Sequence, residues 1–224
     1  MNLPNKITLT RIFMIPVFIV VFYCGLVNEW CFLAAAGVFL LAASTDALDG
    51  HIARSRHLVT DLGKFLDPIA DKVLVSTAFI VLLTIPVVFE VSPFGIYGLV
   101  AAGVCVALIL ARELIVSGFR MIAAGKKIVL AADKLGKVKT VFQDAAIALL
   151  LVAMPFLTIY APNQMLPLSM DITTRYHDCY LAGEIIAYIG LACFALATVL
   201  TVVSGVHYMV KNKEVLKEQK ESVA

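Results

Sequence analysis

The chain has 224 residues, of which 61% are hydrophobic and only 15% are charged, and its formal net charge is +2. Soluble domains are about half apolar and about a quarter charged. The composition excludes a disordered chain, a solenoid of charged repeats and almost any water-soluble enzyme, because a small core cannot bury this much apolar surface. We therefore predict an integral membrane protein.

Six apolar stretches follow one another along the chain, and each is long enough to cross about 30 Å of hydrocarbon as a helix. Their residues do not alternate in polarity as those of a lipid-facing β-strand do. The predicted transmembrane helices are residues 7–26, 29–52, 68–90, 95–123, 137–160 and 180–210. The sequence thus predicts an all-α membrane protein, with a single six-helix transmembrane domain at 1–210 and a basic tail at 211–224.

Basic residues predict the orientation of these helices. With six spans, both termini lie on the same side as the second and fourth loops. All of the 18 Lys and Arg residues except Arg175 fall on that side or at its helix ends. Because basic segments stay on the inner side of a membrane, we expect a multi-pass protein of the cell (inner) membrane, with both termini in the cytoplasm.

An acidic cluster surrounds the second predicted loop. Asp46 and Asp49 end the second predicted helix, and Asp67 and Asp71 begin the third. Spacings of three and four residues put each pair on one helix face, and the short connection makes the two helices antiparallel neighbours. Four carboxylates can then converge at the cytoplasmic edge. Because carboxylate oxygens are hard ligands, they favour Mg²⁺ or Mn²⁺, and four of them can hold two ions.

Three further residues lie beside the acidic cluster. Gly50 and Ala53 are one helical turn apart, and small residues there let a ligand or a helix approach the backbone closely. Arg54 brings a planar guanidinium that suits phosphate oxygens. The simpler alternative is that Gly50 and Ala53 only pack helices and that Arg54 only sets the topology.

These residues together form the pattern D-x-x-D-G-x-x-A-R-x8-G-x3-D-x3-D, which resembles the signature of the CDP-alcohol phosphotransferase family. All eight fixed positions are filled, by Asp46, Asp49, Gly50, Ala53, Arg54, Gly63, Asp67 and Asp71. The resemblance implies a six-helix membrane enzyme, usually a homodimer, whose active site lies at the cytoplasmic edge. It implies that the enzyme transfers a substituted phosphate from a CDP-linked donor to an alcohol and releases CMP.

The resemblance also implies a role for each motif residue. Two divalent cations, Mg²⁺ or Mn²⁺, would be held by Asp46, Asp49, Asp67 and Asp71. The cytidine and pyrophosphate of the donor would be bordered by Gly50, Ala53, Arg54 and Gly63. Asp71 would be the catalytic base that takes the proton from the acceptor hydroxyl. Thr8 lies at the same depth, and we expect it to line the nucleotide site.

A second polar block interrupts the fourth apolar stretch. This stretch contains Arg112, Glu113 and Arg120, and charged residues are costly inside a membrane unless they face a partner or a cavity. The fifth stretch begins on the same side of the membrane with Lys137 and Lys139. We expect the four cations, Arg112, Arg120, Lys137 and Lys139, to bind the phosphate of a phosphorylated acceptor. An acceptor without a phosphate, such as inositol, serine or choline, would not require such a cluster of cations. The alternatives are an intramembrane ion pair of Arg112 with Glu113 and a basic helix end at the two lysines.

Three segments, at residues 4–11, 111–120 and 136–143, resemble the phosphatidylglycerophosphate synthase branch of this family. The resemblance implies transfer of a phosphatidyl group from CDP-diacylglycerol to the sn-1 hydroxyl of glycerol 3-phosphate, which gives phosphatidylglycerol phosphate and CMP. A site at the cytoplasmic edge gives the lipid donor access from the bilayer and the acceptor access from the cytosol.

Two alternatives stay open. A sister enzyme would use another acceptor, such as inositol phosphate, phosphatidylglycerol or serine. A cation or proton transporter belongs to another class, because intramembrane carboxylates mark ion paths; against it, the acids lie at one edge of the membrane and nothing comparable follows at its midplane. The expected partners are the two substrates, the lipid bilayer and a second copy of the chain, with no nucleic acid.

Overall fold

The computed structural model describes residues 3–56, 61–91, 95–125, 134–159 and 170–212. Within these ranges, the side chains of residues 3–8, 46–56, 61–71, 124–125, 134–135 and 170–176 lie outside the description. The described backbone is helical apart from short turns. The prediction of an all-α protein is therefore confirmed.

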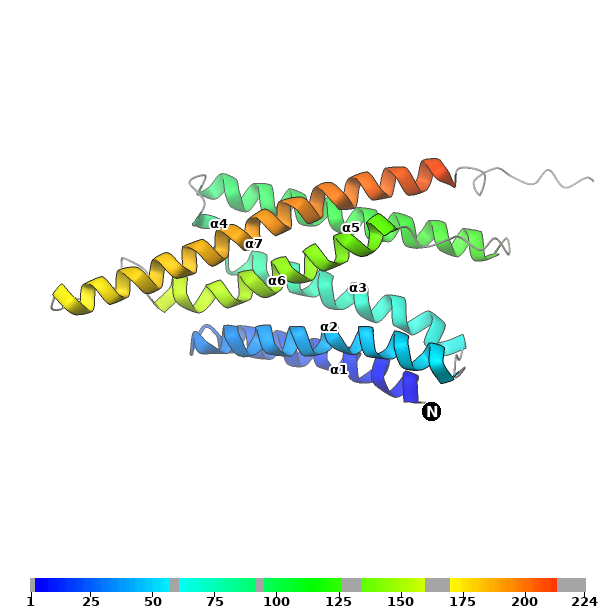
Figure 1. Cartoon of the computed structure of the whole chain (residues 1–224), viewed down its shortest axis with the longest axis horizontal. Coiled ribbons are helices and arrows are strands. Elements are labelled where there is room, and N and C mark those ends of the chain that lie inside the picture. The colour runs from blue at the N-terminus through cyan, green and yellow to red at the C-terminus, as the bar shows by residue number, and fades with distance from the viewer. Residues whose placement is uncertain (1–2, 57–60, 92–94, 126–133, 160–169, 213–224) are drawn as a thin grey trace, which may run out of the picture.

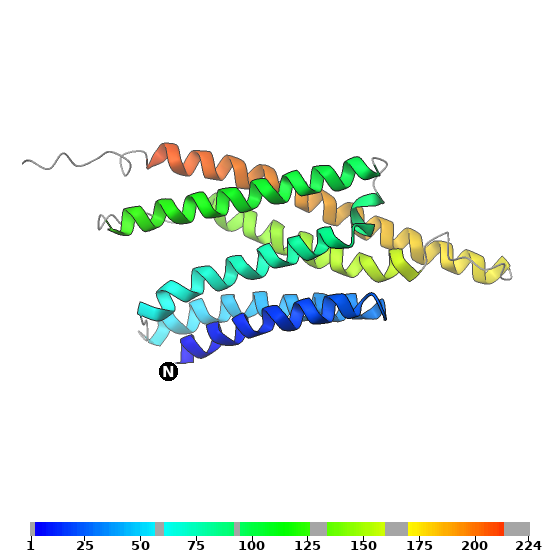
Figure 2. The same ribbon diagram turned by 180° about the vertical axis from the view of Figure 1, so that it is seen from behind.

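In the described part of the chain, six long helices and one short helix follow one another, and Figures 1 and 2 show their arrangement. They are α1 (Leu3–Cys24), α2 (Trp30–Arg56), α3 (Asp61–Thr84), α4 (Val87–Glu90), α5 (Ile96–Gly125), α6 (Lys134–Ile159) and α7 (Met170–Lys211). The six long helices correspond in order to the six predicted spans. The third predicted stretch is broken, because Pro86 has no N–H to donate and α4 starts a new turn after it.

The long helices have the length and composition of membrane spans. Helices α5, α6 and α7 contain stretches long and apolar enough to cross a membrane, at Ile96–Ala123, Gly136–Ile159 and His177–Lys211. Helices α1, α2 and α3 contain shorter apolar stretches among the described residues. Their 22, 27 and 24 residues nevertheless extend over about 33–40 Å at about 1.5 Å per residue.

Large apolar side chains cover the outside of the helices. Phe13 on α1, Leu114 on α5 and Val203 on α7 are all exposed, and many other valines, leucines and isoleucines share this property. Such a surface is unfavourable in water and favourable in lipid. The protein is therefore a multi-pass membrane protein, as its composition predicts.

Small residues let α7 pack closely against α6. An added Cβ at Gly183 would lie 2.7 Å from Cβ of Phe156, and one at Gly190 would lie 3.1 Å from the Leu150 side chain. Without a hydrophobic driving force between helices in lipid, such close backbone contact is a main source of helix association. The buried positions of α7 recur every three or four residues, at Gly183, Ala187, Gly190, Phe194, Ala197, Thr201, Ser204 and Tyr208.

The basic residues gather at one end of the bundle. Figure 1 shows the start of α1, the end of α2, the starts of α3 and α6, and the ends of α5 and α7 toward the same end. We call it the basic end, because it carries Arg11, Lys72, Arg120, Lys139 and Lys211. This arrangement agrees with the predicted topology. The side of the membrane that the basic end faces stays a prediction, as does the division between the domain at 1–210 and the tail.

Candidate functional site

The acidic motif straddles the connection between α2 and α3. Asp46 and Asp49 lie in the last turns of α2, whereas Asp67 and Asp71 lie in the first turns of α3. Figure 1 shows both helix ends at the basic end of the molecule. The side chains of these aspartates lie outside the described residues, so their convergence on a shared pair of ions stays a prediction. The same holds for the predicted donor-binding residues Thr8, Gly50, Ala53, Arg54 and Gly63.

Helix α1 contributes a buried cation next to this motif. The side chain of Arg11 is only 1% exposed, and its Nε donates a hydrogen bond of 3.4 Å to Thr45 Oγ1 on α2. Thr45 directly precedes Asp46. A buried cation is costly unless it has partners, and the Thr45 hydroxyl is one of the partners of Arg11.

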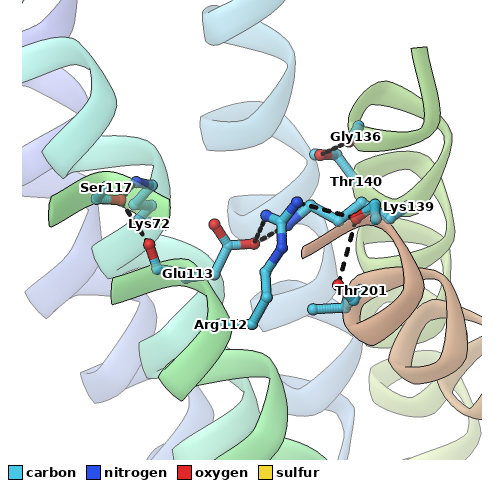
Figure 3. A network of polar contacts seen from close by, with 9 residues as sticks. Lys72, Arg112, Glu113, Ser117, Gly136, Lys139, Thr140 and Thr201 are labelled. Atoms are coloured by element: carbon cyan, nitrogen blue, oxygen red, sulfur yellow. Dashed lines mark hydrogen bonds and ion pairs between the residues drawn. The ribbon is translucent and has the colours of Figure 1, made fainter. Parts of the chain in front are cut away.

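The first described side chain after the motif is Lys72, which joins α3 to α5. Its Nζ donates a hydrogen bond to Ser117 Oγ, and Ser117 in turn donates to the Glu113 carbonyl oxygen at 2.5 Å. Figure 3 shows this pair beside Glu113. The residue that follows Asp71 is therefore fixed to the helix that carries the second polar block.

Glu113 brings two of the predicted acceptor-binding cations together. Its Oε1 accepts a hydrogen bond from Lys139 Nζ on α6 and lies 3.6 Å from Arg112 Nη1 (Figure 3). We call Lys72, Arg112, Lys139 and Glu113 the charged cluster; three positive charges and one negative charge leave it a formal surplus of two positive charges. The Arg112–Glu113 ion pair, which was the alternative to acceptor binding, is thus present, and Lys139, which is 5% exposed, extends it. Binding of the acceptor phosphate by these cations stays a prediction.

Helix α7 holds Arg112 in place. Arg112 Nη2 donates a hydrogen bond of 2.9 Å to Ser204 Oγ. An added Cβ at Gly205 would lie 2.7 Å from Arg112 Cγ, so the side chain lies directly against the backbone of α7. Sequence reasoning missed both residues, because Ser204 and Gly205 look like ordinary small residues of a membrane helix.

The other two predicted acceptor-binding cations lie elsewhere. Arg120 contacts Tyr208 on α7, with its Nε 3.3 Å from the phenol oxygen and its guanidinium carbon 5.4 Å from the ring centroid. Lys137 is exposed at the start of α6. The structure therefore joins Arg112 and Lys139 through Glu113, whereas Arg120 and Lys137 lie nearer to the surface of the basic end.

A small cavity lies beside the charged cluster, between α3, α5 and α6. It measures about 30 Å³ and is lined by Lys72, Ser76, Glu113, Thr140 and Gln143 together with Val75, Phe79, Ile109 and Leu110. Gln143 is 3% exposed, and its Nε2 has no hydrogen-bond partner among the residues that the structure describes. Sequence reasoning did not name Gln143 as a site residue. The signal that could have identified it is its position one helical turn after Lys139 in an apolar helix, where polar side chains often have a function.

The described side chains contain no other candidate metal centre. No three His, Cys, Asp or Glu residues come together among them, and the five cysteines are free thiols. The side chains of the predicted ligands Asp46, Asp49, Asp67 and Asp71 lie outside the described residues.

Comparisons with known proteins cover almost the whole chain. The sequence model of the CDP-alcohol phosphatidyltransferase family matches residues 1–203. A CDP-diacylglycerol–glycerol-3-phosphate 3-phosphatidyltransferase of Bacillus subtilis (strain 168) is 38% identical, with 96% of this chain and 97% of that protein aligned. Proteins with the same name from Rickettsia felis and Shigella flexneri serotype 5b are 37% and 33% identical, over 92% and 93% of this chain and 93% of each relative.

Proposed function

Because the chain belongs to the CDP-alcohol phosphatidyltransferase family, we propose that it transfers the phosphatidyl group of CDP-diacylglycerol to glycerol 3-phosphate. The products are phosphatidylglycerol phosphate and CMP. One observation carries the choice of acceptor: relatives that align over at least 92% of this chain are named for this acceptor. A cation transporter or a sister enzyme with inositol phosphate, phosphatidylglycerol or serine as acceptor has no comparable support.

The reaction exchanges one oxygen–phosphorus bond for another. The sn-1 hydroxyl oxygen of glycerol 3-phosphate attacks the phosphorus that bears the diacylglycerol. The bond from that phosphorus to the oxygen of CMP breaks, and CMP leaves with both bonding electrons. The hydroxyl proton passes to the Asp71 carboxylate, which acts as a general base as the new bond forms.

The motif carboxylates suit divalent cations by their chemistry. Four carboxylates on two helix ends that lie at the same end of the molecule (Figure 1) form an oxygen donor set of the kind that Mg²⁺ and Mn²⁺ prefer. Asp46, Asp49, Asp67 and Asp71 would hold two such ions. Bound there, the ions would neutralise the charge of the pyrophosphate and of the departing CMP.

The donor site follows from the motif. As the family resemblance implies, Gly50, Ala53, Arg54 and Gly63 would border the cytidine and pyrophosphate of the donor, with the guanidinium of Arg54 suited to phosphate oxygens. Thr8 would line the nucleotide site. The diacylglycerol tails stay in the bilayer, which the apolar outer surface of the helices contacts.

The charged cluster supports an anionic acceptor. It begins one residue after Asp71 and gathers three cationic side chains, which suit a phosphate dianion that arrives from water. Glu113 orients Arg112 and Lys139, so these side chains lose less conformational entropy when phosphate binds. Arg120 and Lys137 lie nearer the surface, and we assign them the attraction of the phosphate on its way in.

The orientation follows from the same charges. We propose that the basic end faces the cytoplasm, so that CDP and glycerol 3-phosphate reach the site from the cytosol and the enzyme lies in the cell (inner) membrane. We further propose that two copies of the chain form a homodimer, as the family resemblance implies.

A purified-protein assay tests the proposed function. The protein in lipid nanodiscs is given CDP-diacylglycerol, Mg²⁺ and one labelled acceptor at a time: glycerol 3-phosphate, inositol phosphate, serine or phosphatidylglycerol. We expect CMP release and label in the lipid phase with glycerol 3-phosphate. Label from another acceptor alone would identify a sister enzyme, and ion flux without CMP release would identify a transporter.

A further inference from the structure

The cavity beside the charged cluster contains a polar group that the mechanism above does not use. The carboxamide of Gln143 lines it, and its Nε2 is buried without a hydrogen-bond partner among the described residues. More than nine-tenths of buried polar groups in proteins are hydrogen-bonded, and a buried donor without a partner destabilises the fold. A residue that is costly to the fold and lines a cavity is a candidate for ligand binding.

The size of the cavity limits what it can bind. A volume of about 30 Å³ accommodates a group about as large as a water molecule. A single hydroxyl group fits this volume. A carboxamide suits a hydroxyl group because its NH₂ donates to the hydroxyl oxygen and its carbonyl oxygen accepts the hydroxyl proton.

The position of the cavity indicates which hydroxyl group it binds. Its lining includes Lys72, the residue after the proposed base Asp71, and Glu113, which holds Arg112 and Lys139 (Figure 3). The proposed acceptor would place its reacting hydroxyl near the base and its phosphate near these cations. The group between those two ends of glycerol 3-phosphate is the C2 hydroxyl.

We propose that Gln143 hydrogen-bonds the C2 hydroxyl of glycerol 3-phosphate and thereby selects this acceptor over three-carbon phosphates that lack it. The inference rests on the proposed function and adds a specificity-determining residue to it. The amide loses its water in the folded protein and regains hydrogen bonds only from an acceptor with a hydroxyl at this place, so an acceptor without it leaves the amide unpaired.

A substrate analogue isolates this contact. The analogue is 3-hydroxypropyl phosphate, which has the same reacting hydroxyl and the same phosphate but no C2 hydroxyl. We expect the wild-type protein to prefer glycerol 3-phosphate by about tenfold or more in kcat/KM. In Gln143→Met, which is close in volume, the preference should fall to about one, because glycerol 3-phosphate is used less well and the analogue is used as before.

Stability and a control variant separate binding from packing. Gln143→Met should keep or raise the Tm of the purified protein, since it removes a buried amide nitrogen that has no hydrogen-bond partner among the described residues. A packing role would lower the Tm and would reduce kcat/KM equally for both acceptors. Thr158→Val is the control, because it removes a polar group elsewhere on α6, a hydroxyl that donates within the helix to the Met154 and Pro155 carbonyl oxygens, and it should keep the preference. Gln143→Asn, which retracts the amide, should also lose the preference.

The outcomes distinguish the two proposals. A wild-type protein that uses both acceptors equally well, or a Gln143→Met variant that keeps the full preference, would overturn the role of Gln143 while the proposed function stands. No transfer to either acceptor by the wild-type protein would overturn the proposed function itself.

Discussion

Arg112 on α5 donates a hydrogen bond to Ser204 on α7, with Nη2 2.9 Å from Oγ, although 92 residues separate the two in the chain. Ser204 is only 1% exposed, and the next residue, Gly205, gives Arg112 room to lie along the helix backbone. The last helix therefore fixes the orientation of a cation that we assign to the acceptor phosphate.

Ser204→Ala should weaken the use of glycerol 3-phosphate. A hydrogen bond to a charged group contributes about 1.5–3 kcal/mol, so we expect kcat/KM for this acceptor to fall by about tenfold or more while the KM for CDP-diacylglycerol changes little. Steady-state kinetics with each substrate varied in turn checks this. Ser204→Thr keeps an acceptor oxygen and should stay close to wild type; equal losses for both substrates after Ser204→Ala would contradict the assignment.

Glu113→Gln should destabilise the protein as well as inactivate it. The change leaves Arg112 and Lys139 with a neutral partner in the interior, and breaking a buried ion pair costs about 3–5 kcal/mol. The Tm of the purified protein measures the loss. Lys139→Met removes the other partner of this contact, so the two substitutions should not be additive. The double variant should be more stable, by about 0.5–3 kcal/mol, than the sum of the two single losses predicts. Simple additivity would show that the two side chains do not interact.

Asp71→Asn should abolish turnover without affecting membrane insertion. The amide cannot accept the hydroxyl proton, and general-base catalysis contributes about 10²–10⁴-fold to a rate. CMP release by equal amounts of membrane-extracted protein is the measurement. Asp178→Asn, at an exposed position of α7, is the control and should keep full activity. Full activity in Asp71→Asn would end the assignment of the base.

Removal of divalent cations should stop the reaction and lower the Tm. Without the ions the four motif carboxylates repel one another, so chelation should destabilise the protein, and added Mg²⁺ or Mn²⁺ should restore both the rate and the Tm. Asp49→Ala should lose the cation-dependent change in Tm. A wild-type Tm that does not respond to chelator would argue against a metal site in the motif.

Gly183→Ala should lower the stability of the protein, and it should not change the KM for one substrate more than the KM for the other. Its new Cβ would lie 2.7 Å from Phe156 Cβ, so α6 and α7 must separate, and overpacking of this kind costs about 1–3 kcal/mol. Gly103→Ala on α5 is the matched control, because an added Cβ there meets nothing within 4 Å. Thermal unfolding of both variants tests the contact; equal Tm values would refute it.

The apolar stretches were sufficient to predict the helices, because a span in lipid must satisfy its own backbone hydrogen bonds and must be apolar over about 20 residues. The boundaries were less exact: α3 begins at Asp61 rather than at 68, and it ends at Thr84 rather than at 90. The first turns of α3 contain polar residues, so a hydropathy pattern does not include them in the span. At the other end, Pro86 ends the helix although the apolar stretch continues.

The sequence by itself determined the membrane class, the order of the helices and the family, because these depend on composition and on spacings within a few turns of chain. Only the tertiary structure decided that Glu113 joins Arg112 to Lys139, that Ser204 and Gly205 hold Arg112, and that Gln143 lines a cavity with its Nε2 unpaired among the described residues. Such relationships depend on how α3, α5, α6 and α7 pack, and packing between distant segments leaves no fixed spacing in a single sequence.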